Sequence, residues 1–170
     1  MKTLVFLFLL LFTVSMQAQY NPEAKRAIRL TPSYGGYKGL NLEAAYEYFI
    51  RPNHSVLIGL ESNYRSRNNS NFLFRHISLN LGYRYNFLTW KKFEFFGGLD
   101  LKHGIAHFTN YEDRELKSTF IPTSRIEVLL EANYNINKNF SIFGKVSTDL
   151  LKCQNCSLIE GIGLGAKYKF

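Results

Sequence analysis

The sequence predicts an all-β protein, an eight-stranded antiparallel up-and-down transmembrane β-barrel with a polar interior filled by side chains. Three observations predict this fold. Apolar residues alternate with polar or small ones along eight segments, short connectors alternate with mostly longer ones, and aromatic residues gather near the segment ends. Alternation with a period of two is the pattern of a strand whose two faces meet different surroundings.

The first residues predict a secretory signal peptide rather than a part of the fold. Lys2 supplies one positive charge, residues 4–14 are an almost unbroken apolar run, and Ala18 ends a short cleavage region. This order of regions is typical of a signal peptide. The run is too short for a membrane-spanning helix, which needs about 20 apolar residues. We therefore expect residues 1–18 to be the signal peptide and residues 19–170 to form the barrel.

The composition excludes several classes of protein. Aromatic residues make up 16% of the chain, with 15 Phe and 11 Tyr, and the formal net charge is +8. A basic chain can bind nucleic acid or an anionic membrane surface. Export excludes nucleic acid as a partner, and the charges are dispersed along the chain. No second long apolar run follows the signal peptide, which excludes a helical membrane protein.

Eight segments carry the alternating pattern, and turn residues separate them. The segments are residues 26–34, 38–49, 55–65, 72–87, 93–108, 119–136, 140–152 and 158–170. The short connectors are residues 51–54, 88–92 and 137–139, and they alternate with residues 35–37, 66–71, 109–118 and 153–157. In an up-and-down barrel all turns of one kind share one end. With eight strands, both termini lie at the end of the short turns.

Each segment has an apolar face and a face that is polar, charged or small. In chain order, the apolar faces carry Ile28, Leu30, Leu40, Leu42, Tyr46, Tyr48, Val56, Ile58, Leu60, Ile77, Leu79, Leu81, Tyr83, Tyr85, Phe93, Phe95, Leu99, Leu101, Ile105, Ile126, Val128, Leu130, Tyr134, Ile142, Val146, Leu150, Leu158, Ile162, Leu164, Ala166, Tyr168 and Phe170. The opposite faces carry Arg29, Glu43, Glu47, Glu61, Arg84, Glu94, Asp100, Lys102, Arg125, Glu127, Glu131, Lys145, Asp149 and Lys167.

The chemistry of the two faces predicts which one meets lipid. Aromatic residues of the apolar face lie near strand ends with aliphatic residues between them, which is the girdle pattern of a membrane barrel. A soluble ligand-binding barrel would instead turn a large apolar face inward. Strands of about ten residues, tilted by ~40°, rise roughly 25 Å, the height of the apolar band. Arg75 and His103 are exceptions on the apolar face.

The end of the chain carries a family resemblance. Tyr168-Lys169-Phe170 follows the alternating residues Ile162, Leu164 and Ala166. This ending resembles the C-terminal signature of bacterial outer-membrane barrels, in which the final aromatics help the barrel-assembly machinery to recognise its substrates. The whole mature chain resembles small OmpA/OmpX-type barrels, and its Gly- and aromatic-rich style is similar to porin-like outer-membrane proteins of Bacteroidetes-type bacteria. The resemblance implies the fold and a place in the cell outer membrane, while function varies within the family.

Two cysteines lie close together near the end of the chain. Cys153 and Cys156 are separated by two residues in a predicted connector. An even number of cysteines in an exported chain points to a disulfide. A metal site would need more ligands than two thiols, and a redox motif of this spacing normally begins a helix. We therefore favour a local disulfide that closes the loop.

One arrangement suggests an enzyme. His76 and Ser78 share a strand face, Glu94 is a candidate acidic partner, and outer-membrane lipid A deacylases are similar in size and use such a set. However, His76 and Ser78 point to the predicted lumen, whereas a site that cleaves lipid should face the bilayer. The favoured interpretation is an interior hydrogen-bonding cluster, because buried polar groups are usually satisfied in that way.

Polar loop residues are candidates for contact with lipopolysaccharide. Arg65 and Arg67 lie beside an Asn-rich stretch, and arginine matches the geometry of phosphate. A solvated loop is the favoured interpretation, since loop tips are polar by default. His103 and His107 share a strand face, but a metal would need further ligands.

The preferred hypothesis is a non-enzymatic outer-membrane barrel with a structural or surface-interaction role. Its expected partners are outer-membrane lipid and lipopolysaccharide, with the barrel-assembly machinery during biogenesis, and no cofactor or metal is expected. Two alternatives stay open, a lipid-modifying enzyme similar to lipid A deacylases and a small-solute channel. Mixed charges on the inner face favour a filled interior over a channel, because eight strands leave room only for side chains.

Overall fold

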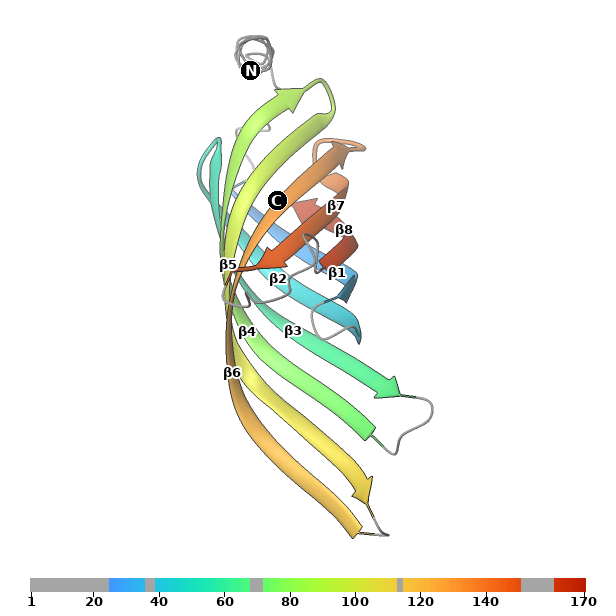
Figure 1. Cartoon of the computed structure of the whole chain (residues 1–170). Helices are drawn as coiled ribbons and strands as arrows, with labels where there is room; N and C mark the ends of the chain where they lie inside the picture. Colours follow the sequence, from blue (N-terminus) through green and yellow to red (C-terminus); the bar gives the residue numbers. More distant parts are fainter. Residues whose placement is uncertain (1–24, 36–38, 68–71, 113–114, 151–160) are drawn as a thin grey trace, which may run out of the picture.

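The computed structural model describes residues 25–35, 39–67, 72–112, 115–150 and 161–170, which form eight strands (Figure 1). The strands are β1 (Arg26–Gly35), β2 (Gly39–Arg51), β3 (His54–Arg67), β4 (Phe72–Trp90), β5 (Phe93–Glu112), β6 (Glu115–Asn135), β7 (Phe140–Asp149) and β8 (Gly161–Lys169). Each strand pairs antiparallel with the next, and β1 pairs with β8. The predicted closed eight-stranded antiparallel barrel is therefore confirmed. In the described part of the chain, no helix is long and apolar enough to cross a membrane.

The strands differ from the prediction mainly at the turns before and after β5. The connectors predicted at residues 88–92 and 109–118 are shorter, because β4 continues to Trp90 and the β5–β6 ladder continues to the pair Glu112 and Glu115. Backbone pairing does not need an apolar face, so the polar end of this hairpin remains a strand. A register shift between Asn86 and Leu88 lets the end of β4 follow β5.

Unequal strands make the two ends of the barrel different. β6 has 21 residues and pairs with β5 over its whole length, but its described pairing with β7 covers only Glu127–Asn135. The far end of the β5–β6 hairpin therefore extends well beyond β1 and β8, as Figure 1 shows at the bottom of the view. Pro122, which pairs with Ile105, interrupts this long edge. Because proline has no N–H to offer, it hinders the addition of a further strand there.

The wall is apolar outside and polar inside, which confirms the predicted assignment of the two faces. Leu130 and Leu164 are 56% and 72% exposed, whereas Glu131, next to Leu130, is only 3% exposed. The buried charged side chains are Arg29, Glu43, Glu47, Glu61, Arg84, Glu94, Asp100, Lys102, Glu127, Glu131, Lys145 and Lys167. Successive side chains of a strand point to opposite sides, so this separation follows directly from the sequence.

Aromatic side chains mark both ends of the outer wall. At the end of the tight turns, the exposed rings are Tyr48, Tyr83, Tyr85, Trp90, Phe93, Tyr168 and Phe170. At the other end they are Tyr34, Tyr64 and Phe120. The positions between the two groups are mostly aliphatic. Arg75 and His103 are exposed on this outer wall, as their positions in the alternation predict.

Candidate functional site

The lumen contains a network of buried ion pairs centred on Glu131. Its carboxylate forms an ion pair with Arg29 and lies 3.6 Å from Lys167 Nζ and 3.9 Å from Arg84 Nε. Lys167 Nζ also lies 2.8 Å from Glu47, whose other carboxylate oxygen accepts a hydrogen bond from Ser55 Oγ at 2.5 Å. One carboxylate thus joins cations from β1, β4 and β8, and its removal would leave all three without their common anion.

Two further clusters extend the network toward the loop end of the barrel. Lys102 and Arg125 both pair with Glu61 and with Glu127, and Arg125 Nη2 donates to Glu61 at 3.0 Å. Farther along the chain, Lys145 Nζ lies 2.6 Å from Glu43. These pairs connect strands that are not neighbours in the wall, such as β2 and β7. Charged side chains therefore cross-link the barrel through its centre.

Arg84 and Asp100 form the best-oriented pair of the lumen. The two Arg84 nitrogens Nη1 and Nη2 donate to the two Asp100 oxygens at 2.6 and 3.0 Å. This parallel arrangement is the bidentate geometry that makes arginine–carboxylate pairs strong. Both side chains are fully buried, so breaking the pair would leave an uncompensated charge in the barrel.

Three phenylalanines complete the filling of the lumen. Lys167 Nζ lies 5.0 Å from the centroid of the Phe96 ring and 5.9 Å from those of Phe49 and Phe143. The Arg29 guanidinium lies 4.3 Å from the Phe143 ring centroid. Cations at these distances are attracted to the faces of the rings. The sequence predicted a polar lumen and did not predict these rings. Their inward positions in the alternation would have indicated them.

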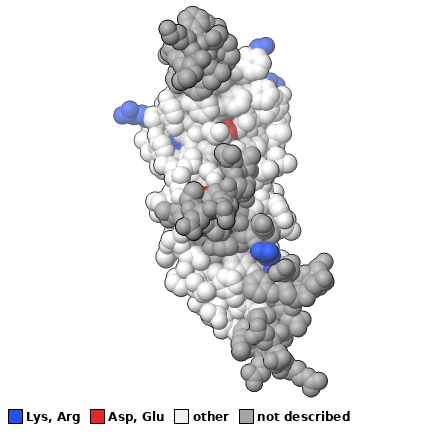
Figure 2. Space-filling view, in the orientation of Figure 1, with Lys and Arg blue, Asp and Glu red and all other residues white. Residues whose placement is uncertain are grey.

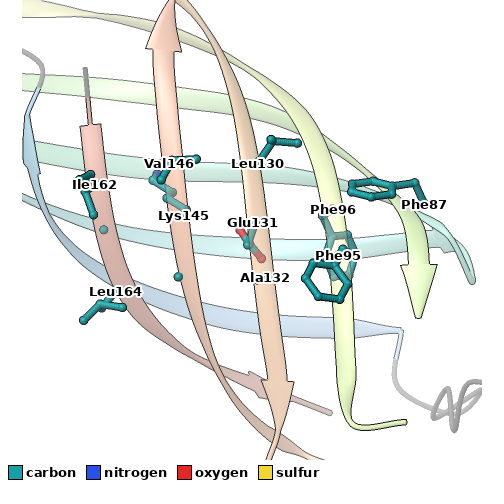
Figure 3. A pocket seen from close by; sticks show the side chains of 12 residues that line it. Phe87, Phe95, Phe96, Leu130, Glu131, Ala132, Lys145, Val146, Ile162 and Leu164 are labelled. Carbon is teal, nitrogen blue, oxygen red and sulfur yellow. The ribbon is translucent and has the colours of Figure 1, made fainter. Parts of the chain in front are cut away.

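The outer wall carries two shallow apolar hollows. One of about 380 Å³ lies over β4 to β8, and Figure 3 shows Leu130, Val146, Ile162 and Leu164 among the side chains that line it. A second lies over β8, β1 and β2, beside Tyr34 and Leu40. Both are open and mostly apolar, and the charged residues that line the first, Glu131 and Lys145, have side chains that are buried in the lumen.

The structure brings together only part of the candidate catalytic set. His76 and Ser78 are buried neighbours on the lumen face, and His76 Nε2 lies 2.7 Å from Thr123 Oγ1. Glu94 pairs in register with Thr89 near the other end of β4, roughly 35 Å from Ser78 at about 3.3 Å per residue. It bonds Lys169 Nζ at 3.2 Å. Glu94 is therefore too far away to act together with His76 and Ser78.

We expect Ser78→Ala to change neither lipid A nor the stability of the barrel by much. Ser78 Oγ is buried and has no hydrogen-bond partner among the described residues. Its loss should change the free energy of unfolding by less than about 1 kcal/mol, since no hydrogen bond is removed. Mass spectrometry of lipid A from cells with either form should give the same acyl pattern. Extra acyl chains appearing only with the variant would revive the enzyme hypothesis.

The loop end of the outer wall carries a row of polar and aromatic groups. Arg75 pairs in register with Tyr64 and with His107, and the His107 ring stacks on Phe120 with centroids 4.5 Å apart. His107 Nε2 lies 2.7 Å from Ser118 Oγ. Arg75, one exception in the apolar face, is thus level with the aromatic rings at the loop end of the wall. His103, the other exception, lies four residues nearer the middle of the wall, where its Nδ1 is 2.9 Å from Ser124 Oγ.

The other predicted site residues have different outcomes. Arg65, at the end of β3, is half-buried, whereas the side chain of Arg67 is outside the described part of the structure. Cys153 and Cys156 also lie outside the described residues, so their disulfide stays a prediction. Among the described residues, no group of three or more His, Cys, Asp and Glu side chains could hold a metal ion.

The C-terminal aromatics lie on the outer wall where the barrel closes. Tyr168 and Phe170 are exposed, and their ring centroids are 6.3 Å apart. The backbone N–H of Phe170 donates to Arg26 O at 2.9 Å, and the Arg26 N–H donates to Phe170 O at 3.2 Å. The last residues thus complete the seam between β8 and β1, which makes closure of the barrel depend on them.

Comparisons with known proteins identify the fold and no family. No family model matches the chain, and no curated protein matches it. Among solved structures, Neisserial surface protein A is similar with a TM-score of 0.61 and 12% identity, covering 85% of this chain and 94% of that one. A major outer membrane protein from Thermus thermophilus is similar with a TM-score of 0.55 and 16% identity, covering 87% and 100%.

A third similar structure is a complex. Ail, the attachment invasion locus protein of Yersinia pestis, bound to the heparin analogue sucrose octasulfate, has a TM-score of 0.51 and 17% identity, covering 85% of this chain and 95% of that one. At these identities the likeness concerns the fold alone. The Bacteroidetes-type origin stays a prediction.

Proposed function

We propose that this chain is an integral protein of the bacterial outer membrane, exported by residues 1–18, with a non-enzymatic structural or surface-interaction role. The observation that carries the proposal is an exposed aliphatic wall between two sets of aromatic rings, around an ion-paired lumen. Such a wall is compatible with hydrocarbon, whereas in water it would be a very large apolar patch. One of the similar barrels, from Thermus thermophilus, is named a major outer membrane protein, which supports this location.

The filled lumen argues for a role carried by the surface. The buried pairs around Glu131 and Lys102 occupy the interior, so a path for solutes would require charged pairs to separate. The part that reaches farthest from the wall is the β5–β6 hairpin, at the end of the longer loops. We infer that this end faces the cell exterior, that Arg65 and Arg67 contact lipopolysaccharide there, and that the hairpin meets other surfaces beyond it.

The names of two similar proteins are consistent with a surface role. One is called a surface protein, and the other an attachment invasion locus protein that binds a heparin analogue. We infer for this chain the same general class, contact with anionic surface molecules. Tyr168 and Phe170 would act earlier, as the signal read by the barrel-assembly machinery.

Spin labels on three consecutive residues of β6 test the membrane location. In the refolded chain in lipid vesicles, labels at Val128 and Leu130 should be accessible to oxygen, which dissolves in hydrocarbon, and shielded from a water-soluble nickel relaxant. A label at Leu129 between them should be shielded from both, because its side chain is buried in the lumen. If the chain stays monodisperse in detergent-free buffer and the labels at Val128 and Leu130 are shielded from both reagents, the proposal is wrong.

A further inference from the structure

The tight-turn end of the barrel carries exposed positive charges. We call them the basic rim, and they are Lys25, Arg26, Arg51, Lys91, Lys92 and Lys138. No described acidic side chain is exposed at this end, since Glu94, the acidic residue nearest to it, is buried and bonded to Lys169. Figure 2 shows blue side chains protruding at this end and another lower in the view, while red is visible only in small patches. Within the described residues, the basic rim therefore lacks acidic side chains as counterions.

Backbone hydrogen bonds tie two of the rim residues to neighbouring strands. The Asn135 N–H donates to Lys92 O at 2.8 Å, and the Phe49 N–H donates to Lys25 O at 3.0 Å. Aromatic rings lie directly beside the lysines. Lys91 Nζ lies 5.6 Å from the Trp90 ring centroid. Trp and Tyr rings prefer the headgroup level of a bilayer, so in a membrane the ammonium groups of Lys91 and Lys92 would lie at the level of the lipid phosphates.

The backbone conformation at Lys91 is a second reason to assign a function to the side chain of this lysine. Lys91 and Lys92 form the two-residue turn between the paired residues Trp90 and Phe93, and Lys91 has a φ of 53°. Turns of this length place Gly, Asn or Asp at positions of positive φ, because a longer side chain is strained there. A lysine in this place opposes the backbone preference. Strained backbone of this kind clusters at functional sites, which makes Lys91 a candidate for a functional side chain.

We propose that the basic rim binds the phosphate groups of anionic phospholipids in the leaflet at the tight-turn end of the barrel. The inference rests on the proposed membrane location. A phosphodiester supplies the negative charge that no described acidic side chain provides at the rim, and the acyl chains of the lipid would lie along the apolar wall beside Trp90. Lysines near an anionic membrane surface each strengthen binding by about fivefold. Anionic phospholipids would thus be enriched around the barrel in that leaflet.

The single tryptophan of the chain reports directly on this site. Trp90 is the only Trp in the sequence and is 57% exposed beside Lys91. The full chain is refolded into vesicles, and quenching of its fluorescence by brominated phosphatidylglycerol is compared with quenching by brominated phosphatidylcholine. We expect phosphatidylglycerol to be preferred severalfold at low salt. The double variant Lys91→Gly/Lys92→Gln should lose most of this preference, and added salt should weaken the preference of the unchanged chain.

The melting temperature in a zwitterionic detergent provides a second measurement, and it should rise in the variant that loses lipid preference. Lys91→Gly should raise the melting temperature by roughly 2–4 °C, because glycine accepts the positive φ. Lys92→Gln should leave it unchanged. Arg75→Gln is the matched control, since it removes an exposed cation at the other end of the barrel and should keep the lipid preference. A mobility shift on heating in detergent gels verifies that each variant is folded.

The outcomes separate this inference from the proposal on which it rests. Loss of the lipid preference in Lys91→Gly together with higher heat stability would support a functional, strained lysine. Equal quenching by the two lipids, or an unchanged preference in the double variant, would overturn the basic rim as a lipid site while leaving the membrane location intact. Absence of quenching by both brominated lipids would instead overturn the membrane location itself.

Discussion

Replacing Glu131 with glutamine is expected to lower the free energy of unfolding by about 3–5 kcal/mol, the cost of removing one partner from a buried ion pair. Glutamine keeps the size of the side chain and removes its charge. Arg29, Lys167 and Arg84 would then share a low-dielectric interior without their common carboxylate. The measurement is urea unfolding of the refolded barrel in vesicles, followed by Trp90 fluorescence.

An exposed charge provides the control for Glu131→Gln. Lys138 lies in the β6–β7 turn, so in vesicles of phosphatidylcholine alone, which carry no net charge, Lys138→Gln should change the free energy of unfolding by less than about 0.5 kcal/mol. If Glu131→Gln costs no more than this control, the interior is hydrated enough to screen the charges. The lumen would then not be the filled core described above, and a channel would again be a reasonable alternative.

The assignment of faces could be predicted from the sequence because it needs only the order of residues. Leu130 points outward and Glu131 inward as soon as the segment is recognised as a strand. The partners inside the barrel could not be predicted in this way. Arg29 meets Glu131 and Lys145 meets Glu43, each across 102 residues of sequence. Such meetings depend on the stagger of the closed barrel, which residue alternation does not encode.

Other features were missed because they break the simple pattern. Phe96 and Phe143 are apolar residues at inward positions, and their role appears only when Lys167 is placed between them. The polar end of the β5–β6 hairpin has no apolar face, so alternation gave no sign of its pairing. For the candidate site, sequence reasoning put His76 and Ser78 on the same face, but it could not place Glu94 at the opposite end of the barrel.

The neighbouring glycines 97 and 98 test the packing of the lumen most directly. Gly98 faces inward, and a Cβ added there would lie 2.6 Å from Tyr83 O and 2.7 Å from Arg84 Cδ. The backbone oxygen cannot move without disturbing the β4–β5 ladder, and movement of Arg84 would break its bidentate pair with Asp100. Gly98→Ala is therefore expected to lower the free energy of unfolding by about 3 kcal/mol or more.

Gly97, on the same strand, is a control because a side chain added there points outward instead of inward. A Cβ added there points to the outer side of the wall, and its nearest neighbour is Phe87 Cδ1 at 3.9 Å. Gly97→Ala should leave the barrel unchanged or stabilise it by about 0.4–1 kcal/mol, because alanine restricts the unfolded chain. Urea unfolding of both variants measures the difference. Equal effects at the two positions would mean that the inner and outer faces are equally open, which is incompatible with a closed, ion-paired lumen.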